Sequence, residues 1–375
     1  MLTPTPSKEE KLYRLALSLV PGIGAVWLKK LLTHLGSAEK VFEVAHQGSG
    51  GVPYKIASLI RGHADLSKAK SVIELHEKEN IQHLTIGEAA YPQRLLDLPD
   101  GPAILYYKGS ALLNKRRVVS IIGTRQLTPY GQDAITQFVS QLLPYRPLIV
   151  SGLAYGTDIL AHKQALFQGL STVAVLPTSI DKVYPAAHRS IALQLCESDG
   201  GLITEYPIGS DLAAYTFVAR NRIIAGMADV TIVIEAKEKS GALITAYYAN
   251  SYHREVFALP GSIFSATAAG CHQLIKRNQA HVLTHINDVA YIMNWDVNPD
   301  RSDKKDGSTI YPLTPSEQLV IDQLKKSKEP VAIDEVMYHT SLSHGELQAA
   351  LLSLELQGLL RILPGKRFAL TKCRA

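Results

Sequence analysis

The stretch VVSIIGTRQLTPYGQDAITQFVSQLLPYRPLIVSG, residues 118–152, decides the fold. It begins and ends with short β-branched runs that lead into a glycine, which is typical of buried strands followed by tight turns. Between the runs, Thr128 can cap a helix and Pro129 suits its first turn. Apolar residues then recur with the spacing of one helical face: Ile135, Phe138, Val139, Leu142 and Leu143. The stretch therefore predicts a strand, a helix and a second, parallel strand.

Four more apolar runs follow the same pattern farther along the chain. They are STVAVLP (171–177), GLITEYP (201–207), VTIVIEA (230–236) and EVFALPG (255–261). Continuous apolar strands separated by helical segments are typical of a parallel sheet that helices cover on both faces. Residues 81–295 are therefore predicted to form a Rossmann-like α/β domain with a doubly wound, mostly parallel sheet.

The region before this domain, residues 1–80, has a helical pattern and is predicted to form a small all-α domain. Pro21-Gly22-Ile23-Gly24 interrupts the helical spacing, which resumes at Val26. This resembles a helix-hairpin-helix motif, whose hairpin presents backbone N–H groups to a nucleic-acid phosphate. The same motif serves equally well to pack two helices, and both interpretations stay open.

The last part of the chain is predicted to be a separate domain. Residues 296–310 are polar and rich in turn formers, so we interpret them as a linker. Residues 311–375 suggest three helices and a two-stranded ribbon, which indicates a winged-helix domain with Ser343 to Gly358 as its recognition helix. The segment has eight basic and seven acidic residues, a weak balance for a DNA reader. A protein-contact or regulatory role is therefore favoured for it.

Bulk composition argues against several classes of protein. Of the 375 residues, 46% are hydrophobic and 19% are charged, as in ordinary folded proteins, and the net charge of +5 is only mildly basic. Cys196, Cys271 and Cys373 are far apart, which indicates neither a disulfide framework nor a zinc ribbon. The sequence has no leader pattern and no apolar run of about 18 residues. We therefore expect a cytoplasmic protein without a membrane segment.

Small and hydroxyl residues follow the predicted strands. In a doubly wound sheet these turns gather at the carboxyl edge, where ligands bind. Small residues let a phosphate approach backbone N–H groups and a helix dipole. Tight packing is the other interpretation, but six successive turns of this kind favour a groove for phosphates. The turns are Gly123-Thr124-Arg125, Ser151-Gly152, Pro177-Thr178-Ser179, Glu205-Tyr206-Pro207, Ser240-Gly241 and Pro260-Gly261-Ser262.

Basic residues are predicted at the same edge, just after a strand or early in the following helix. A row of cations beside backbone amides suits a long phosphodiester chain better than one mononucleotide. Arg220 and Arg222 are two apart on a helix and do not share a face, so one of them is expected to pair with an acid such as Glu205 or Glu235. The predicted row consists of Arg125, Lys163, Lys182, Arg189, Arg220, Arg222 and Lys276.

Eight segments between residues 121 and 280 form a characteristic series. They are IIGTR (121–125), SGLAYGTDILAH (151–162), DKVYPAAHR (181–189), LITEYP (202–207), FVARNRIIAGMAD (217–229), SGALITAYYA (240–249), VFALPG (256–261) and GCHQLIKRNQA (270–280). In this order they closely resemble the DprA or Smf family of DNA-processing proteins. The resemblance implies a homodimer that coats incoming single-stranded DNA during natural transformation and loads the RecA recombinase onto it. A helical N-terminal domain and a C-terminal winged helix also fit that family.

By matching position, the resemblance implies a set of DNA-contact residues. They are Gly123, Thr124, Arg125, Ser151, Gly152, Arg189, Phe217, Arg220, Asn221, Arg222 and Lys276. The predicted set is completed, from their places in the same turns and helices, by Gly156, Lys163, Ser240 and Gly241. Two positions depart from the family pattern. Ala214-Tyr215 stands where some relatives have a lysine, and His188-Arg189 replaces a commoner Asn-Lys pair.

No catalytic residue, metal or cofactor is predicted. His162 is expected on a helix face without a nucleophile or a carboxylate pair, and Asp158 is expected to cap a helix rather than bind a metal. The main alternative is a nucleotide-binding, phosphoribohydrolase-like enzyme on the same type of sheet. Such an enzyme needs an acid after its glycine-rich loop, whereas residues 240–245 are followed by Ala246. A nicotinamide oxidoreductase is less favoured because residues 121–125 lack the GxGxxG spacing, and a pure interaction scaffold is the third alternative.

Overall fold

The computed structural model describes residues 6–48, 50–210, 212–295, 313–327, 330–356, 359–363 and 367–370. The chain divides into two compact units, Met1–Val297 and Asn298–Ala375. The predicted linker at 296–310 lies outside the described residues.

The N-terminal helices begin at well-defined caps. Ser7, Ser37 and Asp65 each accept a hydrogen bond from a backbone N–H group of the helix that follows them. The predicted break at residues 21–24 separates the first two helices, and Gly22 there has φ +89°, which favours glycine. The helices are α1 (Lys8–Ser18), α2 (Ala25–Leu35), α3 (Ala38–Gln47), α4 (Tyr54–His63) and α5 (Leu66–Lys78). The helical pattern is therefore confirmed, and α1 and α2 are separated where the sequence predicted a break.

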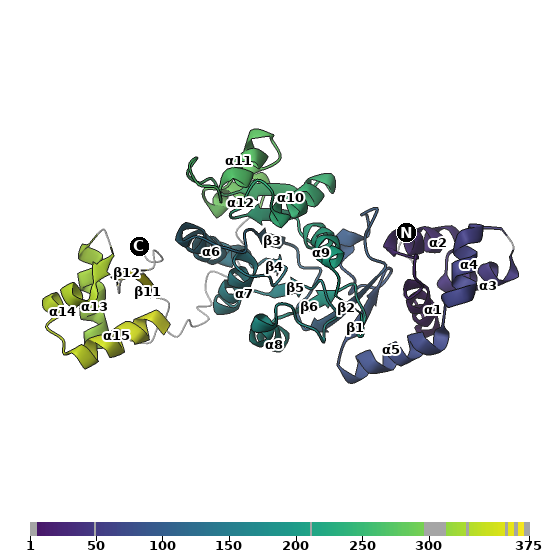
Figure 1. Ribbon diagram of the computed structural model, residues 1–375, viewed down its shortest axis with the longest axis horizontal. Helices are drawn as coiled ribbons and strands as arrows, with labels where there is room; N and C mark the ends of the chain where they lie inside the picture. Colours follow the sequence, from purple (N-terminus) through teal and green to yellow (C-terminus); the bar gives the residue numbers. More distant parts are fainter. Residues whose placement is uncertain are drawn as a thin grey trace. The chain divides into compact units, whose positions relative to one another are not determined.

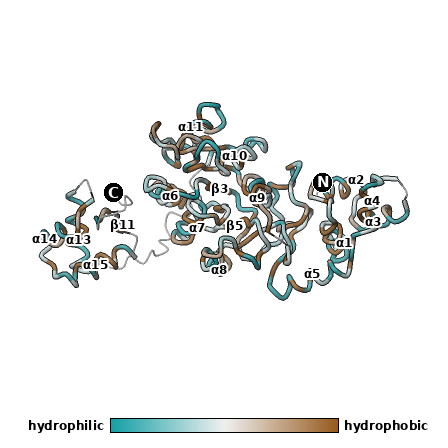
Figure 2. The backbone as a smooth tube through the Cα atoms, in the orientation of Figure 1, coloured by the Kyte–Doolittle hydropathy of each residue, from teal (hydrophilic) through white to brown (hydrophobic). Residues whose placement is uncertain are grey.

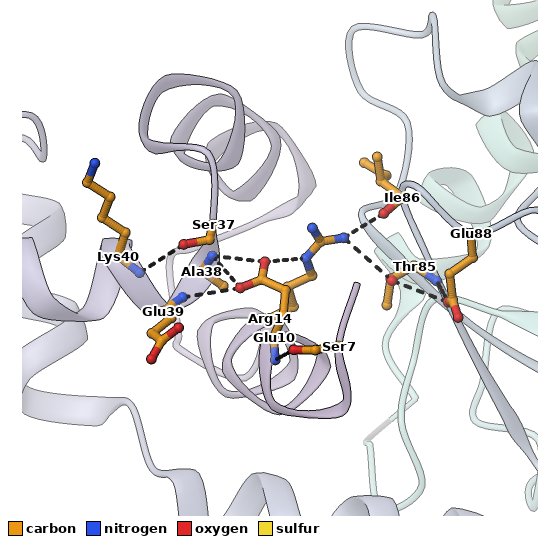
Figure 3. Close-up of polar contacts among 10 residues, drawn as sticks. All are labelled: Ser7, Glu10, Arg14, Ser37, Ala38, Glu39, Lys40, Thr85, Ile86 and Glu88. Atoms are coloured by element: carbon orange, nitrogen blue, oxygen red, sulfur yellow. Dashed lines mark hydrogen bonds and ion pairs between the residues drawn. The ribbon is translucent and has the colours of Figure 1, made fainter. Parts of the chain in front are cut away.

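Hydrogen bonds between side chains and backbone join these helices to the chain next to the sheet (Figure 3). Arg14 on α1 donates a hydrogen bond to the carbonyl oxygen of Ile86 at 2.5 Å and another to the Glu10 carboxylate at 2.7 Å. Glu10 also accepts from the backbone N–H of Ala38, at the start of α3, at 2.9 Å. On α2, Lys29 donates to the carbonyl oxygen of Leu98 at 2.7 Å. The bonds to Ile86 and Leu98 cross from the helices to the chain around the first two strands, and both parts lie within the first compact unit.

The described part of this unit contains a nine-stranded sheet (Figure 1). Its strands are β1 (Gln82–Thr85), β2 (Ile104–Gly109), β3 (Val118–Ile122), β4 (Leu148–Ser151), β5 (Thr172–Val175), β6 (Gly200–Thr204), β7 (Val230–Val233), β8 (Glu255–Ala258) and β9 (His281–Val282). Their order is β1-β2-β6-β5-β4-β3-β7-β8-β9. The six predicted runs are β3 to β8, which pair in parallel. The prediction of a doubly wound, mostly parallel sheet is confirmed, although β1, β2 and β9 were not predicted.

Helices cover both faces of the sheet, and the strands between them are hydrophobic along most of their length (Figure 2). They are α6 (Pro129–Gln141), α7 (Thr157–Phe167), α8 (Arg189–Glu197), α9 (Ala214–Met227), α10 (Gly241–Ser251), α11 (Ala269–Lys276) and α12 (Ile286–Ile292). One hydrophobic cluster joins the sheet to α6, α7 and α12 through Ile135, Ala161 and Val289. Another joins it to α9, α10 and α11 through Ile223, Ala246 and Cys271. The predicted cap of α6 is confirmed, since the Thr128 side chain accepts from the N–H of Gly131.

The strand order changes direction at β3. From β3 the chain crosses to β4, β5 and β6 in turn on one side, then returns through α9 to β7 on the other side. In open α/β sheets, ligands bind outside the carboxyl ends of the strands near such a switch point. The loops after β3, β4 and β5 are neighbours at this carboxyl edge, because the three strands are adjacent.

The second unit has its own core and is described by itself. Val320, Leu324, Val336, Leu351 and Phe368 are among its buried residues. Its elements are α13 (Pro315–Lys326), β10 (Val331–Ala332), α14 (Ile333–Thr340), α15 (His344–Leu356), β11 (Leu360–Leu363) and β12 (Arg367–Leu370), with strand order β10-β12-β11. The predicted winged-helix fold is confirmed, with one more short strand, β10, than was predicted.

Candidate nucleic-acid interface

The loop after β4 is held tightly by its neighbours. The Asp158 carboxylate accepts hydrogen bonds from the backbone N–H groups of Gly152 and Ala154, at 3.2 and 3.4 Å. The His188 Nδ1 atom lies 2.7 Å from the carbonyl oxygen of Leu153. Asp158 was predicted to cap α7, and that is wrong: Gly156 is the cap residue, and Asp158 instead holds the loop that precedes the helix.

Three glycines of the predicted set allow close packing inside the protein. A Cβ atom at Gly123 would lie 2.4 Å from the Thr157 hydroxyl, and one at Gly152 would lie 2.5 Å from the Arg220 guanidinium. Gly156 has φ +74°, and its Cβ would lie 2.3 Å from the carbonyl oxygen of Thr124. At these turns the packing interpretation accounts for glycine. That their backbone contacts DNA stays a prediction.

Two other predicted contacts, Ser151 and Thr124, are buried. The Ser151 hydroxyl donates to the carbonyl oxygen of Ile121 at 2.6 Å. The Thr124 hydroxyl accepts from the N–H of Gln126 at 3.1 Å and so shapes the turn that carries Arg125. Both side chains organise the edge of the sheet from within.

The two arginines of the RNR segment have different partners. Arg220 is only 5% exposed and donates to the carbonyl oxygens of Gly152, at 2.7 Å, and of Val175. Arg222 forms an ion pair with Glu205 and donates to the carbonyl oxygen of Asp100. The prediction that one arginine pairs with an acid is confirmed for Arg222. The side-chain amide of Asn221, between them, donates a hydrogen bond to the carbonyl oxygen of Gly241 at 3.4 Å.

Burial dominates the electrostatics behind this edge. It lowers the pKa of Arg220 to about 10 even though the negative charge of Asp158 raises it, and it raises the pKa of Asp158 even though Arg220 lowers it. Burial also lowers the pKa of His162 to about 3. His162 is fully buried, with Nδ1 2.7 Å from the Thr172 hydroxyl. The His162 imidazole is therefore a neutral packing group at physiological pH.

Arg125 and Arg189 remain exposed at the edge. The Arg125 guanidinium lies over the ring of Phe217, 6.0 Å from its centroid, and the rings of Phe217 and Tyr184 meet edge to face at 5.2 Å. A buried acid such as Glu235 could have paired with Arg125, but the Glu235 carboxylate accepts hydrogen bonds from Thr128 and from Thr267. The loops after β3 and β5 thus meet the first turn of α9 in a cluster of the exposed Arg125 and Tyr184 side chains around the partly buried ring of Phe217.

Two predicted cations lie away from this cluster. Helices that follow parallel strands run back toward the amino edge, and Lys276 is in the last turn of α11. The nearby carbonyl oxygen of Gln279 accepts from Asn250, near the end of α10. Lys276 was predicted just after a strand or early in a helix, and this placement is wrong. Lys163 is exposed in the second turn of α7.

The turn after β7 extends the edge beyond the switch point. Ser240 caps α10 by accepting from the N–H of Ala242 at 3.2 Å. Gly241 is exposed, and no atom lies within 4 Å of where its Cβ would stand. Of the glycines in the predicted set, Gly241 is therefore the one that leaves open space for a ligand.

Sequence reasoning missed two aromatic residues at this edge, Tyr155 and Tyr184. Both are substantially exposed, and each lies in the loop between a strand and the next helix. A tyrosine in a strand-to-helix turn is the signal that could have found them. In the described ranges, no group of three His, Cys, Asp or Glu side chains could hold a metal ion. No helix within those ranges is both long and apolar enough to span a membrane.

Comparisons with known proteins agree with the fold. The family model of DNA recombination-mediator protein A matches residues 82–294, and that of the DprA winged helix domain matches residues 305–366. The chain is 35% identical to Protein Smf from Synechocystis over 398 aligned positions, which cover 96% of the chain and 99% of that protein. It is 38% identical to DNA processing protein DprA from Streptococcus pneumoniae over 213 positions, covering 57% and 74%.

Two solved structures are also similar. DNA processing protein A from Streptococcus pneumoniae superposes with a TM-score of 0.64 at 31% identity, covering 76% of this chain and 98% of that one. DNA processing protein A from Helicobacter pylori, described for its single-stranded DNA binding mode, gives a TM-score of 0.52 at 30% identity, covering 58% and 98%. The chain therefore belongs to the DNA recombination-mediator protein A family, the DprA or Smf proteins.

Proposed function

We propose that this chain binds single-stranded DNA without sequence preference along the carboxyl edge of its sheet. The observation that carries the proposal is the cluster of the exposed Arg125 and Tyr184 side chains around the partly buried ring of Phe217. A guanidinium beside aromatic rings can hold a phosphate while bases stack, which is how non-specific single-strand binders work. Arg189 and the open turn at Gly241 extend the same surface. The Helicobacter pylori relative, described as binding single-stranded DNA, supports this assignment.

Family membership supports a more specific proposal about the role of DNA binding in the cell. We propose that the chain acts as a cytoplasmic homodimer that protects DNA entering during natural transformation and loads RecA onto it. We further propose that it acts by binding and catalyses no reaction. RecA loading is tested by measuring RecA nucleation on a single strand with and without the chain. The homodimer is tested by measuring the solution mass with and without an oligonucleotide.

A direct binding assay tests the central claim. We expect a thymidine oligomer and a mixed-sequence oligomer of equal length to bind with similar affinity. A blunt duplex should bind at least tenfold more weakly, about 1.4 kcal/mol, because paired bases cannot reach the aromatic rings. Fluorescence anisotropy at one fixed salt concentration measures all three affinities. Equal or tighter binding of the duplex contradicts the proposal, and hydrolysis of a free nucleotide would favour the enzyme alternative.

Deleting residues 311–375 is expected to leave most of the affinity intact. This segment contributes almost no net positive charge, and the second compact unit has its own buried core. The same anisotropy assay compares the shortened chain with the full one. A loss of more than about 2 kcal/mol in binding free energy would assign the winged helix to DNA binding.

A further inference from the structure

Tyr155 is an exposed aromatic residue on a loop that is built to hold its position. Its side chain is 49% exposed. The backbone on its N-terminal side is clamped by Asp158 and His188, and Leu153 there adopts φ +57°, an unfavourable conformation for a residue other than glycine. On its other side, Gly156 packs against the turn of Thr124. These constraints hold the exposed ring of Tyr155 in a fixed position, which indicates that the ring has a binding role.

The place of this loop connects the two exposed arginines. The N–H of Thr157 donates to the carbonyl oxygen of Thr124 at 3.1 Å, next to Arg125. The ring of Tyr155 meets the ring of His188 at 4.7 Å and 69°, and Arg189 follows His188 directly. Tyr155 therefore lies between the loops that carry Arg125 and Arg189.

The free surface of the ring suits a flat partner. An edge-to-face contact covers one side of an aromatic pair and leaves the ring accessible elsewhere, in agreement with the half-exposed side chain. Phe217 and Tyr184 already contact each other, and Arg125 lies over Phe217. Among the aromatic side chains named at this edge, Tyr155 is the one whose ring contact is with a buried histidine rather than with that cluster.

We propose that Tyr155 is a stacking platform for one unpaired base of the bound strand, whose flanking phosphates lie on Arg125 and Arg189. This inference rests on the proposed single-strand binding and adds the group that recognises the base. Stacking on a tyrosine accepts any base, so the site remains insensitive to sequence. A base in a duplex is already stacked and paired, so Tyr155 also contributes to the discrimination between single and double strands.

The test compares two polymers of the same length and charge. One is a thymidine oligomer, and the other carries abasic residues throughout, so that it offers phosphates without bases. In the full-length protein, Tyr155→Ala is expected to weaken binding of the thymidine oligomer roughly 5- to 150-fold, the range for loss of one base–aromatic stack. Binding of the abasic polymer should not change. Tyr155→Phe keeps the ring and should restore the wild-type affinity.

A second aromatic residue supplies the matched control. Phe167 is 71% exposed at the far end of α7, the helix that Tyr155 precedes, and Phe167→Ala is expected to leave binding unchanged. Equal losses of Tyr155→Ala on both polymers, or a lowered melting temperature that accounts for the loss, would show that Tyr155 only shapes the loop. Wild-type affinity of Tyr155→Ala for the thymidine oligomer would overturn the inference. Failure of the wild-type chain to bind either polymer would instead overturn the proposed function.

Discussion

Replacing Arg220 with alanine is expected to lower the free energy of unfolding by about 3–5 kcal/mol. Arg220 is buried, and its guanidinium satisfies the carbonyl oxygens of Gly152 and Val175 at the ends of two neighbouring strands. It also places a positive charge near the buried Asp158 carboxylate. Its removal leaves buried acceptors without a donor and a buried acid without a nearby cation. Urea denaturation at neutral pH measures the loss.

The controls separate this structural role from DNA contact. Arg116→Ala removes an exposed arginine at the amino end of β3 and should change stability by no more than about 0.5 kcal/mol. Arg220→Lys keeps the charge but loses the guanidinium, whose Nη1 group donates to both carbonyl oxygens, and should be destabilised by less than the alanine variant. An Arg220→Ala protein with normal unfolding and much weaker DNA binding would assign Arg220 to the strand instead.

The parallel core of the sheet was predictable because its signal is local. Each of the strands β3 to β8 is a short apolar run, and helical periodicity separates successive runs. The missed strands lack all or part of that signal: β2 begins with a buried apolar run, but no helix separates it from β3. β2 contains Tyr106 and Tyr107 and pairs antiparallel with both β1 and β6, while β9 has two residues. These strands pair with an edge of the sheet that is formed by distant parts of the chain, so their own short sequences do not reveal the pairing.

The candidate site was predictable in position but less so in detail. The sequence marks where glycine is required, but it does not say which group comes close. At Gly152 that group is the Arg220 guanidinium, which lies 68 residues farther along the chain. The sequence offered Glu205 and Glu235 as acids that could pair with an arginine of this segment. In the structure Arg222 pairs with Glu205, while Glu235 accepts hydrogen bonds from two threonine side chains.

The placement of Lys276 failed for a reason that is geometric. A helix rises about 1.5 Å per residue, so the last turn of an eight-residue helix lies roughly 10 Å from its start. A residue there returns toward the amino edge of the sheet even though it follows a strand in the same connection. Counting residues from the start of α11, rather than from β8, would have placed Lys276 correctly.

Replacing Arg125 with alanine is expected to weaken single-strand binding by roughly 1.5–3 kcal/mol, the scale of one charge-assisted hydrogen bond. The guanidinium is exposed beside Phe217, and Glu235, the acid that could have held it, bonds to Thr128 and Thr267. The Arg125 guanidinium is therefore free to bind a phosphate bidentately. The slope of log affinity against log salt should fall by about one counterion. A salt titration of binding measures both effects.

Arg116→Ala is the matched control, because Arg116 lies two residues before the start of β3 and Arg125 lies just beyond its carboxyl end. Arg116→Ala and Arg125→Ala each remove one positive charge, so the general electrostatic attraction between protein and DNA is the same in the two variants. We expect Arg116→Ala to keep nearly the wild-type affinity and slope, and both variants to melt like the wild type. Equal losses in the two variants would mean that only net charge matters. A large drop in melting temperature for Arg125→Ala with an unaltered salt slope would mean that Arg125 supports the fold and does not bind the strand.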